Sequence, residues 1–79
     1  MKTNTNTANV FSNSRRVTVI SPNDERNWAE YHKHLGEFHV YKHNEHYATF
    51  EITSGFNRVY FTDEQAVKHM MEALEEEGL

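Results

Sequence analysis

FHVYK at residues 38–42 and YATFEI at residues 47–52 decide the fold of this chain. In both stretches apolar and polar side chains alternate, which is typical of half-buried β-strands. The alternation places Phe38 and Val40 on the same side as Phe50. An asparagine, a residue favoured in turns, lies between the two stretches. We therefore expect an antiparallel hairpin with one buried face.

Downstream of this hairpin, the sequence predicts a third strand and a helix. Gly55 allows a positive φ in a turn before a strand at 58–61. Thr62 and Gln65 have the spacing of a capping box, so a helix is expected to begin after Thr62 and to close at Gly78. An apolar face then follows at helical spacing. Its members are Ala66, Val67, Met70, Met71 and Leu74.

Upstream of the hairpin, three further segments are expected. Residues 1–14 are rich in Asn, Thr and Ser and are predicted to be a disordered tail. RRVTVI at residues 15–20 predicts a short strand, with Val17 and Val19 facing inward. A helix is expected to follow from Pro22 to about Leu35. It would be capped by Ser21 and Gly36 and have Trp28, Tyr31 and Leu35 as its apolar stripe.

The predicted fold class is α+β in the order β-α-β-β-β-α. It consists of an antiparallel three-stranded meander plus a short N-terminal strand, packed by two helices. Residues 15–79 would form a single domain after the tail at 1–14, because so short a chain allows one core.

Composition narrows the classes of function. The chain has no cysteine, which excludes disulfides, thiolate metal sites and cysteine nucleophiles. It shows no secretory signal and no apolar run long enough to span a bilayer, so a cytoplasmic location is expected. Glycine-rich phosphate loops and nucleophile elbows are also missing. We therefore predict a protein that is not an enzyme and has no cofactor.

Charge is unevenly distributed along the chain. The formal net charge is −4, and from Thr62 onward six acidic residues stand against the single base Lys68. An acidic surface repels a phosphate backbone and suits a partner with a basic surface. A protein partner is therefore expected, binding of nucleic acid is not, and a homodimer is possible because strand edges are exposed.

Two sets of side chains are candidates for partner binding. Aromatic residues beside an arginine on the polar side of the sheet would suit an interface. The acidic last helix could offer carboxylates to a basic partner. The predicted partner-binding residues are Tyr41, Tyr47, Arg58, Tyr60, Glu72, Glu75 and Glu76. An alternative for the aromatics is packing under the first helix or the tail, and for the acids a merely solvated surface.

Histidine is over-represented, with five of six histidines between residues 32 and 46. His39, His43 and His46 could supply three nitrogens to zinc at one hairpin. His32 and His34 are two residues apart and would diverge on a helix, and no zinc-protease motif is present. The sequence therefore favours exposed, titrating histidines over a metal site.

The order helix, three antiparallel strands, helix from Pro22 to Leu79 resembles the double-stranded RNA-binding fold and the small mRNA-interferase toxins built on it. That family places lysines at the start of its last helix to grip phosphates. Here the corresponding stretch is Thr62-Asp63-Glu64-Gln65-Ala66, whose charge has the opposite sign. His39 loosely matches a strand histidine of the toxins. The resemblance thus concerns topology, with no RNA-cleaving activity carried over.

A second resemblance is of type. Small, acidic, cysteine-free α+β proteins with a polar tail are similar to many phage-encoded inhibitors, including anti-CRISPR proteins, which act by occluding a partner. It implies a protein-binding module, a phage or mobile-element inhibitor that blocks a host nucleic-acid-handling complex. The alternative is a nucleic-acid-binding or RNA-cleaving domain that uses Arg15, Arg16, Lys42 and Arg58 with the histidines. A third hypothesis is a histidine metal sensor.

Overall fold

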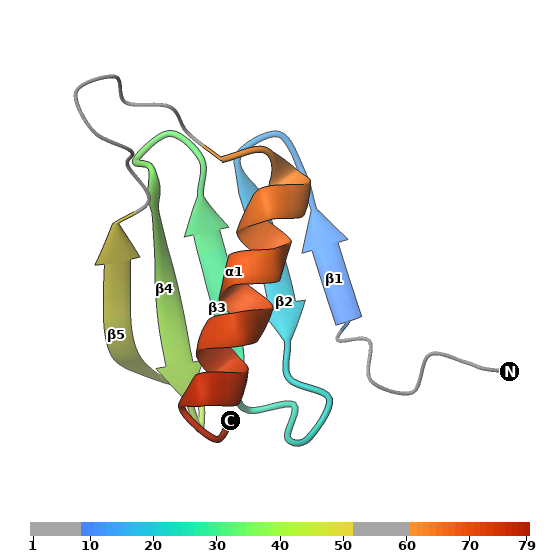
Figure 1. The fold of residues 1–79 in the computed structure, drawn as a ribbon, viewed down its shortest axis with the longest axis vertical. Coiled ribbons are helices and arrows are strands. Elements are labelled where there is room, and N and C mark those ends of the chain that lie inside the picture. The colour runs from blue at the N-terminus through green and yellow to red at the C-terminus, as the bar shows by residue number, and fades with distance from the viewer. Residues whose placement is uncertain (1–8, 52–60) are drawn as a thin grey trace, which may run out of the picture.

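The computed structural model describes residues 9–51 and 61–79. Within them the chain forms a sheet of five strands and one helix (Figure 1). Strands that follow one another in sequence are neighbours in the sheet, and every pair is antiparallel. The elements are β1 Asn9–Ser12, β2 Arg16–Ile20, β3 Trp28–His32, β4 Glu37–Lys42, β5 Glu45–Glu51 and α1 Asp63–Glu76.

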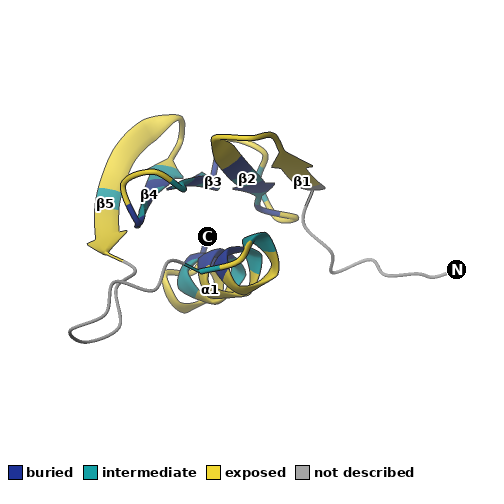
Figure 2. Ribbon diagram, turned by 90° about the horizontal axis from the view of Figure 1, so that it is seen from above, coloured by how far each residue is buried: buried dark blue, intermediate teal, exposed yellow. Residues whose placement is uncertain are grey.

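The core lies between α1 and one face of the sheet, as the view along the helix shows (Figure 2). The helix buries Ala66, Met70 and Leu74 at the spacing of one helical face. Against them lie alternate residues of the three central strands, which are almost completely buried. These strand residues are Val17, Val19, Ala29, Tyr31, Phe38 and Val40.

The hairpin of β4 and β5 forms as the alternation predicts. Phe38 lies opposite Phe50, and their rings stack with centroids 5.0 Å apart. His43 and Asn44 make the turn with φ angles of 52° and 65°. Two successive positive φ values are characteristic of the type I′ turn, whose twist matches that of the strands. The predicted strand with Val17 and Val19 inward is confirmed as β2.

The predicted helix from Pro22 to Leu35 is wrong, because this segment is a loop followed by strand β3. Ser21 does not cap a helix; its hydroxyl donates to the carbonyl oxygen of Leu79 and accepts from the amide of Asn23. Trp28 and Tyr31 then fall on opposite faces of the sheet. Gly36 has the expected positive φ of 66°, but it serves a turn between two strands.

The predicted order β-α-β-β-β-α, with a three-stranded meander packed by two helices, is therefore wrong. The described chain is a five-stranded antiparallel sheet with one C-terminal helix. A further difference is that residues 9–12, which lie in the segment predicted to be a tail, form strand β1 and pair with β2. The strand expected at 58–61 falls almost entirely outside the described residues.

The capping box at the start of α1 is confirmed. The hydroxyl of Thr62 accepts from the amide of Gln65, and the side chain of Gln65 accepts from the amide of Thr62. In the same first turn, Asp63 accepts hydrogen bonds from Lys33 at 3.0 Å and from Ser12 at 2.9 Å. These bonds lower the pKa of the Asp63 carboxyl, with the bond from Lys33 as the largest cause.

The lowered pKa of the Asp63 carboxyl predicts that the protein loses stability in acid. A carboxyl whose pKa is lowered by folding stabilises the native state above its unfolded-state pKa of about 4, and this contribution disappears as the pH falls through the lowered pKa. The pair with Lys33 is partly exposed. Its contribution should therefore be about 0.5–1 kcal/mol. In urea titrations at about pH 6 and about pH 3, Asp63→Asn should lose less stability than the wild type, whereas Glu64→Gln should not differ from it. Equal losses in all three proteins would contradict this.

Candidate functional site

The sheet has a second face, opposite the core, that no residue of 9–51 or 61–79 covers (Figure 2). Because side chains alternate along a strand, the neighbours of the buried core residues point to this side. The strand register arranges them in three rows across β2, β3, β4 and β5. We call these rows together the open face. Most of its side chains in the three central strands are half-buried.

An aromatic row crosses one end of the open face. It comprises Ile20, Trp28, Tyr41 and His46, each paired with the next across neighbouring strands. The rings of Trp28 and Tyr41 are stacked, with centroids 3.9 Å apart and an interplanar angle of 11°. The indole nitrogen of Trp28 donates to Asn44 at 3.0 Å. This bond and the stacking fix the two large rings as a rigid platform, which is a favourable property for an interface residue.

Histidines and carboxylates occupy the other two rows. One row contains Thr18, Glu30, His39 and Thr49, and the other contains Arg16, His32, Glu37 and Glu51. Nε2 of His39 lies 2.5 Å from Oε2 of Glu37. Nε2 of His32 lies 2.9 Å from Oε1 of Glu30, which is within ion-pair distance. This second contact is an ion pair only if His32 is protonated, and Nε2 of His32 has no hydrogen-bond partner in the described chain.

The charge of the open face is negative when its histidines are neutral. Three glutamates, Glu30, Glu37 and Glu51, stand against one arginine. That arginine, Arg16, is 3.5 Å from Glu30 and is therefore engaged within the face. The face thus combines a rigid aromatic platform with an excess of carboxylates.

The histidine set proposed from sequence as a possible zinc site is not assembled. His39 and His46 do lie together on the open face, with ring centroids 5.6 Å apart. His43, however, is in the turn at the end of the hairpin. In the part of the chain that the structure describes, no group of three or more His, Asp or Glu side chains is arranged to hold a metal ion.

The residues predicted to bind a partner lie on two different surfaces. Tyr41 is on the open face beside Trp28. The acidic residues Glu72, Glu75 and Glu76 are exposed on α1, on the opposite side of the sheet. Arg58 and Tyr60 lie outside the described residues.

Tyr47 is separated from Tyr41 although both are aromatic residues of the same hairpin. Its hydroxyl donates to Glu77, just beyond α1, at 2.6 Å, so its side chain reaches toward the helix side of the sheet. The neighbouring carboxylate raises the pKa of the Tyr47 hydroxyl, because loss of the proton would break this bond and place two negative charges together. Tyr47 is therefore not part of the open face.

Sequence reasoning missed most of the residues that make the site. Trp28, Glu30 and His32 were not proposed as binding residues, because 22–35 was interpreted as a helix, and Glu37, just beyond that segment, was not proposed either. The signal that could have found them is the alternation in WAEYH at residues 28–32. There Ala29 and Tyr31 face the core, and the other three residues face away from it.

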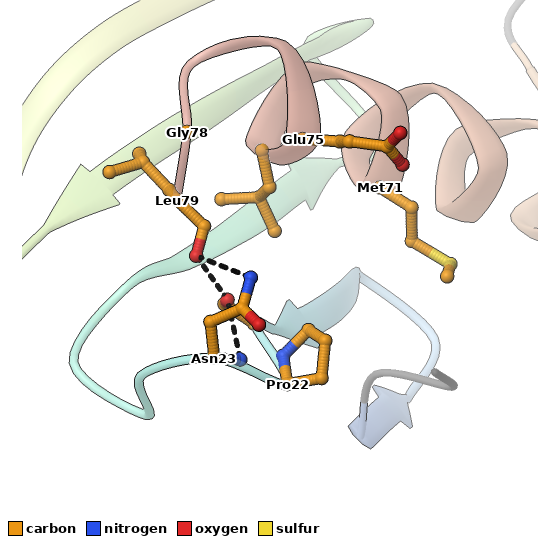
Figure 3. A pocket seen from close by; sticks show the side chains of 8 residues that line it. Pro22, Asn23, Met71, Glu75, Gly78 and Leu79 are labelled. Atoms are coloured by element: carbon orange, nitrogen blue, oxygen red, sulfur yellow. Dashed lines mark hydrogen bonds between the residues drawn. The ribbon is translucent and has the colours of Figure 1, made fainter. Parts of the chain in front are cut away.

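A hollow with a volume of about 440 Å³ lies at the end of α1 (Figure 3). It is lined by the loop from Ser21 to Asn23 and by residues near the helix C-terminus, including Met71 and Leu79. The side chains of Ser21 and Asn23 both donate to the carbonyl oxygen of Leu79. Because these polar groups already bond to one another, the hollow is a weaker candidate site than the open face.

Comparison with known proteins identifies no relative. The chain matches no protein-family model, and no curated protein or solved structure is significantly similar to it. Among the described residues, the one helix is too short and too polar to cross a membrane. The function must therefore be argued from the open face itself.

Proposed function

We propose that this protein is a non-enzymatic protein-binding module that docks a partner with a basic surface on its open face. The observation that supports this most is the rigid stack of Trp28 and Tyr41 on an uncovered sheet face with excess carboxylates. Large aromatic rings are the commonest anchors of protein interfaces, and their ring faces attract arginine and lysine. Glu30 and Glu37, in the neighbouring rows, supply complementary charge for the same side chains.

A nucleic acid is the less suitable ligand for this face. Exposed aromatic rings on a sheet can stack on bases, which is the feature that favours this alternative. Proteins that use such platforms surround them with positive charge, because the phosphates must be neutralised. Here the one arginine in the rows of the open face, Arg16, is paired with Glu30. The resemblance to the RNA-binding fold also rested on a first helix that does not form.

The proposed mode of action is occlusion. A partner that offers a basic surface to this acidic face is of the kind that normally holds nucleic acid, so binding would block that surface. This is how an inhibitor encoded by a phage or mobile element would disable a host nucleic-acid-handling complex, and a cytoplasmic location belongs to the same proposal. The exposed glutamates of α1 are a second and weaker candidate surface for binding a basic partner.

Three probes in an NMR titration test this proposal. A short oligo-arginine peptide, an oligo-glutamate peptide and a single-stranded oligouridylate are added separately to the labelled full chain at neutral pH. We expect the arginine peptide alone to shift the indole signal of Trp28 and the amides of β3 and β4. Shifts at these positions from the oligouridylate, without any from the arginine peptide, would replace the proposal with the nucleic-acid alternative.

Charge-reversed variants separate the two acidic surfaces. Glu37→Lys should weaken binding of the arginine peptide, because it removes one of the three carboxylates of the open face. The triple variant Glu72→Lys, Glu75→Lys, Glu76→Lys should leave the Trp28 shifts in place, since those acids lie on α1. If only the triple variant loses binding, the acidic helix is the docking surface and the open face is not.

A further inference from the structure

Three histidines lie within one contact network on the open face. The ring of His39 is in the centre, with its centroid 4.6 Å from that of His32 and 5.6 Å from that of His46. His46 also meets the ring of Tyr41 edge-on at 5.8 Å, which connects the network to the aromatic platform. The side chains of His32 and His39 are 16% and 22% exposed, so part of each ring is accessible on the open face. The histidines are therefore part of the surface on which a partner would dock.

The groups around these histidines come from each neighbouring strand. His32 faces Arg16 of β2 and Glu37 of β4, with Glu30 on its own strand. His34, in the following turn, is 6.2 Å away between ring centroids.

His39 faces Glu30 of β3, and Glu37 contacts it on its own strand. Thr49 of β5 is its neighbour on the other side and accepts or donates a hydrogen bond with Nε2 of His46 at 2.8 Å. Glu51 lies opposite Glu37 at the end of the sheet. The fixed charges around the network are thus three glutamates and Arg16.

Because of this balance, the sign of the net charge of the open face depends on whether its histidines are protonated. Imidazole is the side chain that ordinarily titrates between pH 5 and 8, whereas glutamate and arginine keep their charges in that range. With neutral imidazoles the carboxylates are in excess. Protonation of His32, His39 and His46 adds three positive charges beside the aromatic platform, which outweighs that excess.

We infer that docking on the open face is proton-gated: a basic partner binds at neutral pH and is released in mild acid. The inference rests on the proposed function and adds its regulation. His32 and His39 already lie within ion-pair distance of Glu30 and Glu37, so their protonation would neutralise the carboxylates that a partner's arginine or lysine needs. The protonated rings would also repel that side chain, so protons and a basic partner compete for the same face.

The experiment measures binding of the oligo-arginine peptide to the full chain at about pH 7.5 and about pH 5.5, at constant ionic strength. The readout is the shift of the Trp28 indole signal, and circular dichroism checks that the protein stays folded. We expect the affinity to fall by about tenfold or more at the lower pH, since each linked proton can change it by up to tenfold per pH unit.

Two variants assign the effect to the network. His32→Gln, His39→Gln and His46→Gln together remove the three imidazoles of the open face, so this variant should bind almost equally at both pH values. The matched control His43→Gln with His69→Gln changes histidines outside the open face and should keep the wild-type pH dependence. If the network variant does not fold, the single variant His39→Gln should still reduce the pH dependence.

The outcomes distinguish the two proposals. Binding at the open face that is equally tight at both pH values overturns the proton gate and leaves the proposed function standing. A wild-type pH dependence in the network variant also overturns the gate. No binding at the open face at either pH removes the proposed function, and the gate with it.

Discussion

Replacing Met70 with alanine is expected to lower the free energy of unfolding by about 2–5 kcal/mol. Met70 is completely buried in the middle of α1, where it packs on the central strands of the sheet. Its truncation removes apolar contacts and leaves a cavity that the rigid sheet cannot fill. A domain of 79 residues has a total stability of only about 4–12 kcal/mol. The substitution should therefore remove a large part of the total stability.

The neighbouring methionine provides a matched control. Met71 is only half-buried and contacts the edge of the same cluster. Met71→Ala removes the same atoms and changes helix propensity by the same amount. Because Met71 is less buried, its truncation should lower the free energy of unfolding by much less than Met70→Ala does. Thermal and urea unfolding followed by circular dichroism measure both. Equal losses in the two variants would mean that α1 does not use the described face to pack on the sheet.

Tyr41→Ala is expected to weaken binding of a basic peptide or partner by about tenfold or more, as is usual for a central aromatic anchor. The substitution removes the ring stacked on Trp28 and leaves the indole less fixed. Loss of the stacking itself should cost about 0.5–1.5 kcal/mol of stability. The two effects are separated by measuring affinity under conditions where unfolding curves show the variant to be fully folded.

Tyr47→Ala is the matched control, because it removes the same side chain from the same hairpin. Tyr47 bonds to Glu77 on the other side of the sheet. Its loss should therefore leave the affinity nearly unchanged. Weaker binding in the Tyr47 variant with an unchanged affinity in the Tyr41 variant would move the docking surface from the open face to the edge beside α1.

Local signals in the sequence were sufficient for α1 and for the β4–β5 hairpin. The capping box of Thr62 and Gln65 is a contact between residues three apart, and the helix that it opens also buries its apolar face in the core, so local and tertiary signals agree. The hairpin is fixed by its alternation and by a turn in which His43 and Asn44 adopt positive φ. Both elements are therefore specified within a few residues.

Strand β3 could not be predicted in the same way, because a local signal competed with a distant one. Ser21-Pro22-Asn23-Asp24 has the composition of a helix start, and Trp28, Tyr31 and Leu35 have helical spacing. In the folded chain, the hydroxyl of Ser21 instead donates a hydrogen bond to Leu79, which is 58 residues away. Tyr31 is buried between β2 and β4, and its hydroxyl donates to the carbonyl oxygen of Phe61. Tertiary contacts thus outweigh the local preference for a helix.

The candidate site was predictable only in part for the same reason. Tyr41 was identified because it lies on a correctly predicted strand. Its stacking partner Trp28 was assigned to a helix stripe, so the platform could not be recognised. The excess of histidines was noticed, but the contact between His32 and His39 depends on the pairing of β3 with β4.

The irregularity in the β4–β5 ladder has a consequence for how this protein can vary. Val40 pairs with Ala48, but the next residue, Tyr41, pairs with His46, so Tyr47 is the additional residue of a β-bulge. The bulge places Ala48 and His46, two residues apart, on opposite faces of the sheet, whereas regular alternation would place them on the same face. A relative lacking Tyr47 would therefore have a regular ladder and would keep its counterpart of His46 beside that of Tyr41. Such a relative would lose the hydrogen bond between strand β5 and Glu77 without losing a residue of the open face.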